Sequence, residues 1–415
     1  MYQRRDAGVR PKALVRGPFA LLGPAFVAAI AYVDPGNFAT NVTAGSTYGY
    51  LLLWVLVLGN AMAMLVQYLS AKAGIATGLN LAELCREHSR PWVRVGLWLQ
   101  AEVVAIATDV AEVLGGALAL NLLFGAPLLV GALITSAVAL ALLEVQSRGV
   151  RPFEVVVAGL LLVILGGFTY SLVAGGVDLS AAGAGLQPRF DGPSSLVLAA
   201  AMLGATVMPH VIYLHGSLTQ ARYRRATEAQ RHALLRCQRI DVVIALTLAG
   251  LVNIVMLVVA ARVLGGGHGP PVTTLEQAHA GLGAALGPTA ALLFAVALLA
   301  SGLAASGVGT LSGQVVMQGL LRRRIPVMAR RLVTLVPALV VVASGLDVTT
   351  ALVGSQVVLS FGIPFALIPL VLLTRRRDLM GSLVNARSTT AVAVLVTAVV
   401  VSLNLALIWG TVRSA

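Results

Sequence analysis

The amino-acid sequence predicts an all-α membrane protein that crosses the bilayer many times and in which two of the crossing helices are broken. Hydrophobic residues make up 58% of the 415-residue chain and charged residues only 11%, whereas a soluble globular chain carries about 25% charged residues. At roughly 20 apolar residues per crossing, ten to twelve spans fit this length. Two of the apolar segments contain, near their middle, a short polar motif with a proline, where a spanning helix should run without interruption.

The apolar segments define eleven predicted spans within a single transmembrane domain, 1–415. We expect the first five to form one repeat over about 17–176 and the next five a second repeat over about 194–374. The last span, about 389–411, follows the two repeats. The predicted spans are 18–44, 49–73, 95–123, 127–147, 152–175, 194–221, 238–263, 286–319, 328–345, 348–373 and 389–411.

The polar segments between the spans alternate between basic and weakly charged. Of the 29 Lys and Arg residues, only Arg189, Arg262 and Arg413 lie on the weakly charged side. This is the positive-inside pattern, so we expect a cytoplasmic N-terminus and, with eleven spans, a C-terminus outside the cell. The pattern also accounts for the net charge of +13, and we therefore expect no nucleic-acid partner.

Two short segments interrupt the first and sixth spans. They are Asp34–Asn37, with the sequence DPGN, and Val207–His210, with the sequence VMPH. Proline removes a backbone donor and glycine frees the backbone, which predicts unwinding at 34–37 and at 206–210. Unwound backbone survives at bilayer depth only where it is buried in protein or lines a cavity. The breaks contain a carboxylate, a carboxamide, a thioether and an imidazole, and this mixture of hard and soft ligands indicates a transported metal ion.

The two breaks occupy matching positions in the predicted repeats. Pro35 and Pro209 each interrupt the first span of a five-span block, and the two blocks enter the membrane from opposite sides. Paired broken helices in inverted repeats indicate a substrate site near the membrane midplane. The halves share no convincing side-chain identity, so the predicted symmetry depends on the topology and the two breaks.

Motifs in five spans together resemble those of the natural resistance-associated macrophage protein (Nramp) family. They are Asp34–Asn37, Gln67–Lys72 closing the second span, the carboxylates of the third span, Gly204–His210, and Ser355–Ser360 in the tenth span. The resemblance implies the LeuT-type fold, with a 5+5 inverted repeat, an eleventh helix, and helices 1 and 6 unwound in mid-membrane. It also implies proton-coupled import of divalent transition metals, here across a bacterial cytoplasmic membrane.

Asp34 is the first candidate metal ligand. A carboxylate in mid-membrane costs about 2.5–3.5 kcal/mol on insertion scales, and the basic residues that could neutralise it cluster at the cytoplasmic edge. Asn37 follows three residues later, where its amide oxygen can reach the same ion; the alternative is that it caps the second half of the helix.

Met208 separates transition metals from the abundant hard cations. Methionine often only fills gaps between membrane helices, but the position of Met208 directly before Pro209 favours a ligand, and the resemblance assigns it that role. A thioether adds little for Mg²⁺ or Ca²⁺ and suits softer ions. The resemblance also implies a ligand in the backbone carbonyl of Ala205. Gln356 would join the ligand shell in some conformations, or else form an interhelical hydrogen bond.

These ligands predict transport of Mn²⁺ and/or Fe²⁺, with Cd²⁺ and Co²⁺ also accepted. The same shell of oxygens and a thioether suits both Mn²⁺ and Fe²⁺, so the sequence does not separate them. We expect no permanently bound cofactor. The expected partners are the metal ions, protons and membrane lipid, with the protein working as a monomer.

A row of carboxylates on the third span is the candidate proton route. Glu102, Asp109 and Glu112 are spaced i, i+7 and i+10, so they fall within about 80° of one helix face. Carboxylates inside a transmembrane helix need partners. We interpret the row as a proton relay from Asp34 toward the cytoplasm; a purely structural ion-pair network is the alternative.

Polar residues on neighbouring spans complete the predicted site. His210 is placed in the proton network or in gating, and Arg330 and Arg331 are candidate partners of the carboxylate row. His215 is either a participant or a packed, hydrogen-bonded histidine, and Arg222 is either an inner-gate residue or a basic anchor. The predicted gating and helix-break residues are Pro35, Gly36, Pro209, Arg222 and Asn253.

Three other functions are considered. A sodium- or proton-coupled amino-acid symporter of the same fold would bind a substrate carboxylate, which Asp34 would repel. A passive cation channel should show a repeated pore-loop filter, and no such repeat is found. HExxH, P-loop and GxSxG motifs are absent, so we do not expect an enzyme.

Overall fold

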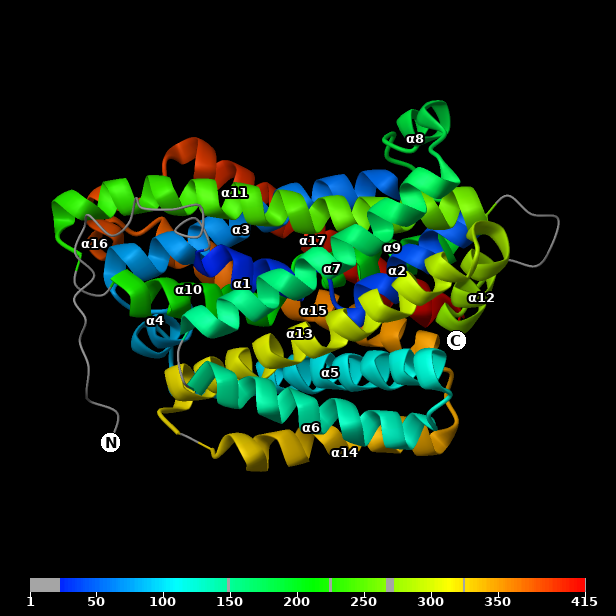
Figure 1. Cartoon of the computed structure of the whole chain (residues 1–415). Helices are drawn as coiled ribbons and strands as arrows, with labels where there is room; N and C mark the ends of the chain where they lie inside the picture. The colour runs from blue at the N-terminus through cyan, green and yellow to red at the C-terminus, as the bar shows by residue number, and fades with distance from the viewer. Residues whose placement is uncertain (1–22, 148–149, 224–225, 266–271, 324, 415) are drawn as a thin grey trace.

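The computed structural model describes residues 23–147, 150–223, 226–265, 272–323 and 325–414. Within these residues the regular structure is entirely helical. Figure 1 shows the long helices running side by side, with the connecting helices at the two ends of the bundle.

The first and sixth spans are each formed by two half-helices. These are α1 (Pro24–Ala31) with α2 (Pro35–Tyr48), and α9 (Gly192–Thr206) with α10 (Pro209–Tyr223). The other spans are α3 (Leu53–Thr77), α5 (Pro91–Phe124), α6 (Leu128–Ser147), α7 (Val150–Gly175), α11 (Glu228–Val259), α13 (Pro288–Leu321), α14 (Val327–Ser344), α15 (Val348–Thr374) and α17 (Arg387–Ser414). A π-helical turn, Ala260–Leu264, extends α11.

The helices agree with the predicted spans. Among the described residues, eight helical segments are long and apolar enough to cross a membrane, with α9 and α10 taken as one. Two more predicted spans fall on α6 and α14, which contain the shorter apolar stretches Leu128–Ala141 and Leu332–Ser344. The first predicted span corresponds to α1 and α2, and its residues 18–22 lie outside the described part of the chain. The limits proposed for the two repeats stay predictions.

Short helices occupy connections where we expected only loops. They are α4 (Leu81–His88), α8 (Leu179–Ala184), α12 (Leu275–Leu286) and α16 (Arg377–Met380), which a short 3₁₀ turn, Gly381–Leu383, follows. Both α4 and α12 begin with a capping box, formed by Asn80 with Glu83 and by Thr274 with Gln277. Such a polar pair three residues apart is the sequence signal that could have revealed these two helices.

The first break lies slightly earlier in the chain than predicted, and the second lies within the predicted 206–210 but is shorter. Helix α1 ends at Ala31 and α2 begins at Pro35, so the non-helical residues are 32–34 and not 34–37. In the sixth span only Val207 and Met208 lie between the two half-helices. The reason is that proline fits the first position of a helix, where its missing N–H would have no partner anyway. Each proline therefore begins the second half-helix.

The half-helices are arranged in opposite senses. In Figure 1, α1 and α10 lie toward the end of the bundle that carries α4 and α16, whereas α2 and α9 lie toward the end with α8 and α12. Helix α1 packs on α10, and α2 packs on α9. The chain thus passes the two breaks in opposite directions, as an inverted pair of repeats requires.

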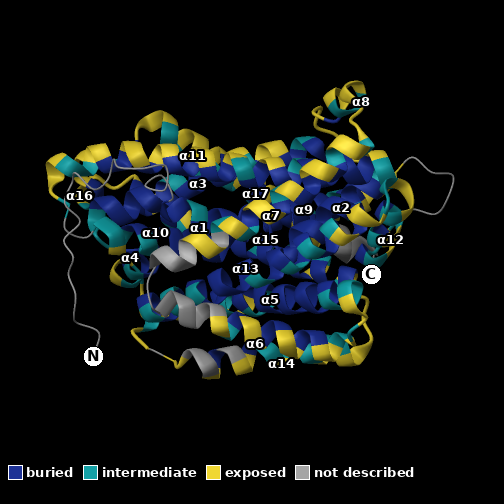
Figure 2. Cartoon of the chain, viewed as in Figure 1, coloured by how far each residue is buried: buried dark blue, intermediate teal, exposed yellow. Residues whose placement is uncertain are grey.

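Burial is highest along the helices that surround the breaks (Figure 2). Helix α5 packs against α13 and α15 in the interior of the bundle. Large apolar side chains point outward on the peripheral helices, among them Leu162, Val333 and Leu395. An apolar outer surface of this kind is stable when lipid covers it.

Gly204 allows α9 to approach α15 closely. A Cβ atom at this position would lie 2.0 Å from the Gln356 carbonyl oxygen and 2.7 Å from the Ser360 nitrogen, both backbone atoms that cannot rotate away. We expect Gly204→Ala to lower the free energy of unfolding by about 2 kcal/mol or more, measured as a fall in melting temperature of the purified protein. The control is Gly354→Ala on α15, where no atom lies within 4 Å. A Gly204 variant as stable as this control would contradict the close contact.

Candidate substrate site at the helix breaks

Asp34 is the last residue of the first break and caps α2. Its Oδ1 accepts hydrogen bonds from the Asn37 backbone nitrogen at 2.7 Å and from Asn37 Nδ2 at 2.8 Å. Asp34, and not Asn37, therefore provides the helix cap. Asp34 is 1% exposed, and among the described residues no Lys or Arg forms a salt bridge with its carboxylate. A buried carboxylate of this kind is costly unless a cation comes to it.

Asn37 joins the two breaks. Its Nδ2 donates to the carbonyl oxygen of Ala205 at 3.2 Å as well as to Asp34. Ala205 belongs to the last turn of α9, directly before the second break, and is fully buried. A carboxylate, a carboxamide and a backbone carbonyl from helices far apart in sequence therefore meet at one place.

Gln356 reaches the same carboxylate from α15. Its Nε2 donates to Asp34 Oδ2 at 3.3 Å and to Ser355 Oγ at 3.2 Å. A Cβ atom on Gly36 would lie 1.7 Å from that nitrogen, so the absence of a side chain at Gly36 makes room for Gln356. We predicted that Gly36 would unwind the helix, but Gly36 is helical and its effect is on packing. The Gln356 contact is the interhelical hydrogen bond considered as the alternative to a ligand role.

Two amide oxygens at this place have no hydrogen-bond partner among the described residues. They are Asn37 Oδ1 and Gln356 Oε1, and both are buried. An unpaired buried acceptor costs about 1–3 kcal/mol. A bound cation would supply the missing partner for both oxygens.

Met208 lies in the second break, directly before Pro209, and is 1% exposed. Among the described residues no three His, Cys, Asp or Glu side chains gather in a conventional metal site. A metal ion at the breaks would thus be held by one carboxylate with amide, carbonyl and thioether groups. Such a ligand set is weaker and less charged than that of a structural metal site, which is suitable for an ion that must be released.

The carboxylate row of α5 has a bidentate ion pair near its start. Arg330 NH1 and NH2 donate to the two carboxylate oxygens of Glu102 at 3.1 and 2.9 Å, and Trp98 Nε1 donates to Glu102 Oε1 at 3.0 Å. Of the two arginines proposed as partners, Arg330 forms this pair, while the side chain of Arg331 lies outside the described residues. Further along the helix, Asp109 and Glu112 are buried.

Helix α13 provides the wall opposite this row. A Cβ atom on Gly309 would lie 2.7 Å from Glu112 Oε1, and one on Gly313 would lie 2.1 Å from Arg330 NH2. The two glycines are four residues apart and so share a face of α13. We did not predict them as part of the site, although their spacing is a signal that could have drawn attention to this helix face.

His210 is the second residue of α10 and is buried. Its Nδ1 has no hydrogen-bond partner among the described residues. Helix α10 packs against both α5 and α13, which brings His210 to the helix pair that contains the carboxylate row. Its part in the proton route stays a prediction.

A second polar chain runs from the first break to α11. Gln67 Nε2 donates to the Tyr32 hydroxyl at 2.7 Å, and Gln67 Oε1 lies 2.9 Å from His215 Nδ1. On its other side, His215 Nε2 is 3.4 Å from Gln238 Nε2, and Gln238 donates to Asp241 Oδ2 at 2.8 Å. His215 is thus a packed, hydrogen-bonded histidine. The chain was missed except for His215, although buried polar residues in apolar spans are themselves a signal.

Asp241 holds the beginning of α1. Its two carboxylate oxygens accept hydrogen bonds from the backbone nitrogens of Gly23 at 3.2 Å and Ala25 at 3.1 Å. Arg222, at the end of α10, lies within electrostatic reach of Asp241. The contacts join α1, α10 and α11 at one end of the bundle, where an inner gate was predicted.

Polar side chains also satisfy the carbonyl groups that the first break exposes. Asn253 Nδ2 donates to the Tyr32 carbonyl at 2.6 Å, and Ser301 Oγ donates to the Val33 carbonyl at 2.6 Å. Asn253 also accepts from Asn41 Nδ2 at 2.8 Å. Asn253 therefore binds the broken first span both at the break and in α2, whereas its role in gating stays a prediction.

A helical bundle with paired broken helices and a buried polar site between them is the architecture of a secondary membrane transporter. Residues 25–410 match the model of the family described as natural resistance-associated macrophage protein-like. The chain belongs to the Nramp family. It is a multi-pass membrane transport protein and not an enzyme.

Relatives and solved structures agree with this assignment. A Deinococcus radiodurans protein named divalent metal cation transporter MntH is 50% identical over 396 residues, which are 95% of this chain and 91% of the relative. A solved structure of a manganese transporter from Eremococcus coleocola is 31% identical, with a TM-score of 0.84 over 97% of this chain and 88% of the other. Mhp1, a nucleobase-cation-symport-1 family transporter, shares the fold at 17% identity, with a TM-score of 0.61 over 93% of this chain and 90% of Mhp1. The predicted LeuT-type fold is confirmed.

Proposed function

We propose that this protein imports divalent transition-metal ions, Mn²⁺ and/or Fe²⁺ and also Cd²⁺ and Co²⁺, across the bacterial cytoplasmic membrane together with protons. The observation that carries the proposal is the convergence of Asp34, Asn37, the Ala205 carbonyl and Gln356 at the paired breaks. Relatives named as divalent metal cation and manganese transporters support the same substrate class.

The hydrogen bonds at the site suggest how an ion is received. Asn37 Nδ2 donates to two oxygens, Asp34 Oδ1 and Ala205 O. A cation bound between these oxygens would take the position that this amide nitrogen now occupies. A half-turn of the Asn37 and Gln356 amides would turn their unpaired oxygens toward the same point. The ion would then replace N–H donors as the partner of the carboxylate, and the buried oxygens would all be satisfied.

Met208 would set the preference for softer ions. Mg²⁺ and Ca²⁺ favour shells made only of oxygen, whereas a thioether suits transition metals. Because Met208 is in the break itself, its sulfur can join the shell only if the ion sits at the breaks. Mn²⁺ and Fe²⁺ would both be accepted by this set.

Transport requires that the site open to each side in turn. Asp34, Asn37 and Met208 are each buried, so the site is closed to solvent in this structure. We infer that α1 and α10 move to open the inner side, which would break the hydrogen bonds between Asp241 and the beginning of α1. Entry of a divalent ion gains about 2.3 kcal/mol per charge per 100 mV of membrane potential.

The proton would leave Asp34 along α5. Asp109 and Glu112 are buried on this helix, and the ion pair of Glu102 with Arg330 lies nearer its start. With the N-terminus in the cytoplasm, this direction leads inward. Each chain contains the full set of proposed ligands and the proton route, so we propose a monomer as the working unit.

Substitutions in the carboxylate row test whether proton movement and metal binding depend on different residues. We expect Asp109→Asn and Glu112→Gln to reduce proton movement about tenfold or more while Mn²⁺ binding stays within about threefold of wild type, because neither residue is a proposed metal ligand. Proteoliposomes with an internal pH dye report proton entry, and calorimetric titration with Mn²⁺ reports binding. Glu87→Gln, at an exposed carboxylate on α4, is the control. Equal losses of proton movement and metal binding in properly folded variants would contradict a separate proton route.

Uptake of Mn²⁺ into proteoliposomes tests the substrate class. We expect Mn²⁺ uptake that Fe²⁺, Cd²⁺ and Co²⁺ inhibit and that a large excess of Mg²⁺ or Ca²⁺ does not. Empty liposomes are the control. Absence of Mn²⁺ uptake by folded protein at any membrane potential would overturn the proposal.

A further inference from the structure

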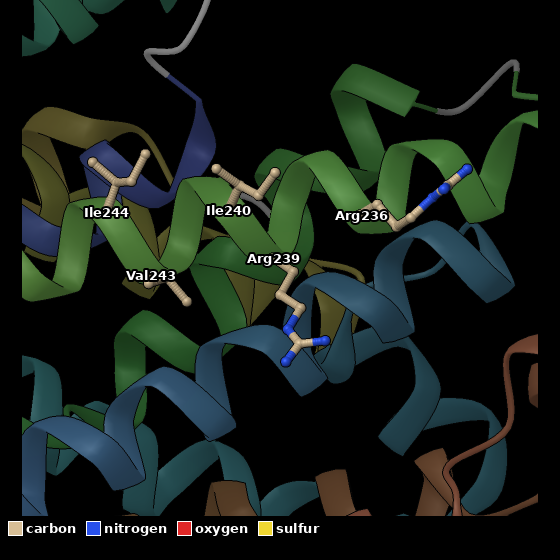
Figure 3. Close-up of a pocket in the computed structure, with 5 residues that line it drawn as sticks. All are labelled: Arg236, Arg239, Ile240, Val243 and Ile244. Atoms are coloured by element: carbon tan, nitrogen blue, oxygen red, sulfur yellow. The ribbon is translucent and has the colours of Figure 1, made fainter.

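A groove on the outer face of α11 combines two arginines with three apolar side chains (Figure 3). Arg236, Arg239, Ile240, Val243 and Ile244 line a cavity of 390 Å³. Figure 3 shows the two arginines at one end of the groove, with their side chains extending in different directions from α11, and the three apolar residues following along the helix. None of the residues that line the groove belongs to the helix breaks or to the proposed ligand set, and the proposed transport mechanism does not use the groove.

The five residues form one continuous face of α11. At 100° per residue they fall within an arc of about 140°. Ile240 is 54% exposed, Val243 46% and Ile244 41%. Gln238 and Asp241 are buried and belong to the polar chain that reaches α1. Helix α11 therefore presents an apolar surface with a charged end to its outside and a polar network to the interior.

Among the described residues, neither Arg236 nor Arg239 forms a salt bridge. Arg239 lies within electrostatic reach of Tyr68 on α3, and the ammonium group of Lys72 is 5.8 Å from the centre of the Tyr68 ring. The carboxylate of Asp241 already accepts hydrogen bonds from backbone nitrogens at the beginning of α1.

We propose that this groove binds one anionic phospholipid, with its headgroup at the end that carries the exposed Arg236 and Arg239 and an acyl chain along Ile240, Val243 and Ile244. Guanidinium groups match the geometry of phosphate oxygens, and basic pockets at the cytoplasmic side of membrane helices bind anionic headgroups. The order of charge and apolar surface along α11 repeats the order of headgroup and tail in a lipid. A choline headgroup would bring its own cation against the two arginines, so the groove selects anionic over zwitterionic lipid.

Native mass spectrometry of the full-length protein in detergent tests the proposal. Phosphatidylglycerol, phosphatidylcholine and inorganic phosphate are titrated separately, and bound adducts are counted. We expect phosphatidylglycerol to bind about tenfold more tightly than phosphatidylcholine, and Arg236→Gln with Arg239→Gln to weaken it about tenfold or more. The control pair is Arg375→Gln with Arg377→Gln, which removes two exposed arginines at the same end of the bundle and should leave binding unchanged.

A second variant tests the apolar part of the groove. Val243→Trp fills the groove while both arginines remain, and we expect it to weaken phosphatidylglycerol binding severalfold without creating binding of phosphatidylcholine. Equal binding of the two lipids, equal effects of the two arginine pairs, or inorganic phosphate binding as tightly as phosphatidylglycerol would each overturn the lipid assignment. Because the measurement counts lipid, its outcome does not depend on which ion the protein transports.

Discussion

Asp34→Ala is expected to abolish metal uptake. The substitution removes the only charged group of the proposed ligand set and with it the hydrogen bonds to Asn37 and Gln356. Removing a group that only hydrogen-bonds to a metal ligand typically lowers metal affinity or activity about 10–100-fold. Removing the ligand carboxylate itself should therefore lower the rate of Mn²⁺ uptake by more than about 100-fold. Initial rates of Mn²⁺ uptake into proteoliposomes, at matched protein density, measure the effect.

A second variant separates the charge of Asp34 from its structural role. Asp34 also caps α2, and asparagine caps helices about as well as aspartate. Asp34→Asn should therefore fold normally, as judged by its melting temperature, and still fail to transport Mn²⁺. Asp378→Asn, at an exposed carboxylate paired with Arg376, should transport at the wild-type rate. Normal Mn²⁺ uptake by Asp34→Asn would remove the carboxylate from the ligand set.

Met208→Ala is expected to change which ions are transported. Without the sulfur, the remaining ligands at the breaks are oxygens, which suit Ca²⁺ and Mg²⁺ as well as Mn²⁺. We expect the preference for Mn²⁺ over Ca²⁺ to fall about tenfold or more. Uptake of each ion alone and in competition measures this preference.

The chain provides a matched control for the methionine. Met202 is another fully buried methionine, on α9 before the break, and Met202→Ala removes the same volume without touching the site. A loss of ion preference in both variants would show that packing, and not sulfur, sets the selectivity. Met208→Leu, which keeps the volume, should behave like Met208→Ala.

The breaks could be predicted from the sequence because their cause is local. Proline and glycine in an apolar span interrupt the helix wherever the span lies in the fold. The first break was predicted a few residues too late and the second, at 206–210, was predicted longer than the two residues observed within it, because Pro35 and Pro209 can also begin a helix. A proline predicts that a helix is interrupted near it, but the packing of the two half-helices decides on which side.

Contacts between distant spans could not be read from the sequence in the same way. The sequence named Gln356 only through a family resemblance, and its contact with Asp34 depends on how α15 packs against α2 and α9. The pairing of Arg330 with Glu102 likewise depends on the rotation of α14. Neighbouring residues on a helix point about 100° apart, so a composition argument cannot distinguish them.

The polar chain from Tyr32 to Asp241 was largely missed for a related reason. Each of its members alone has an ordinary explanation, such as a helix end or a hydrogen bond across an interface. Only the packing of α3 and α10 against the beginning of α11 turns Gln67, His215 and Gln238 into one connected path. Buried polar residues in apolar spans indicate that partners exist, and the fold decides which ones they are.

The central claim is that one site carries a transition metal and protons into the cell together. Mn²⁺ uptake and internal pH recorded in the same proteoliposomes, at a fixed inside-negative potential, test it most directly. The account predicts that added Mn²⁺ enters and acidifies the lumen, that Ca²⁺ and Mg²⁺ do neither, and that Asp34→Asn shows no response. Entry of Mn²⁺ with an unchanged lumen pH would contradict proton coupling, and entry of Ca²⁺ at the same rate would contradict the metal site.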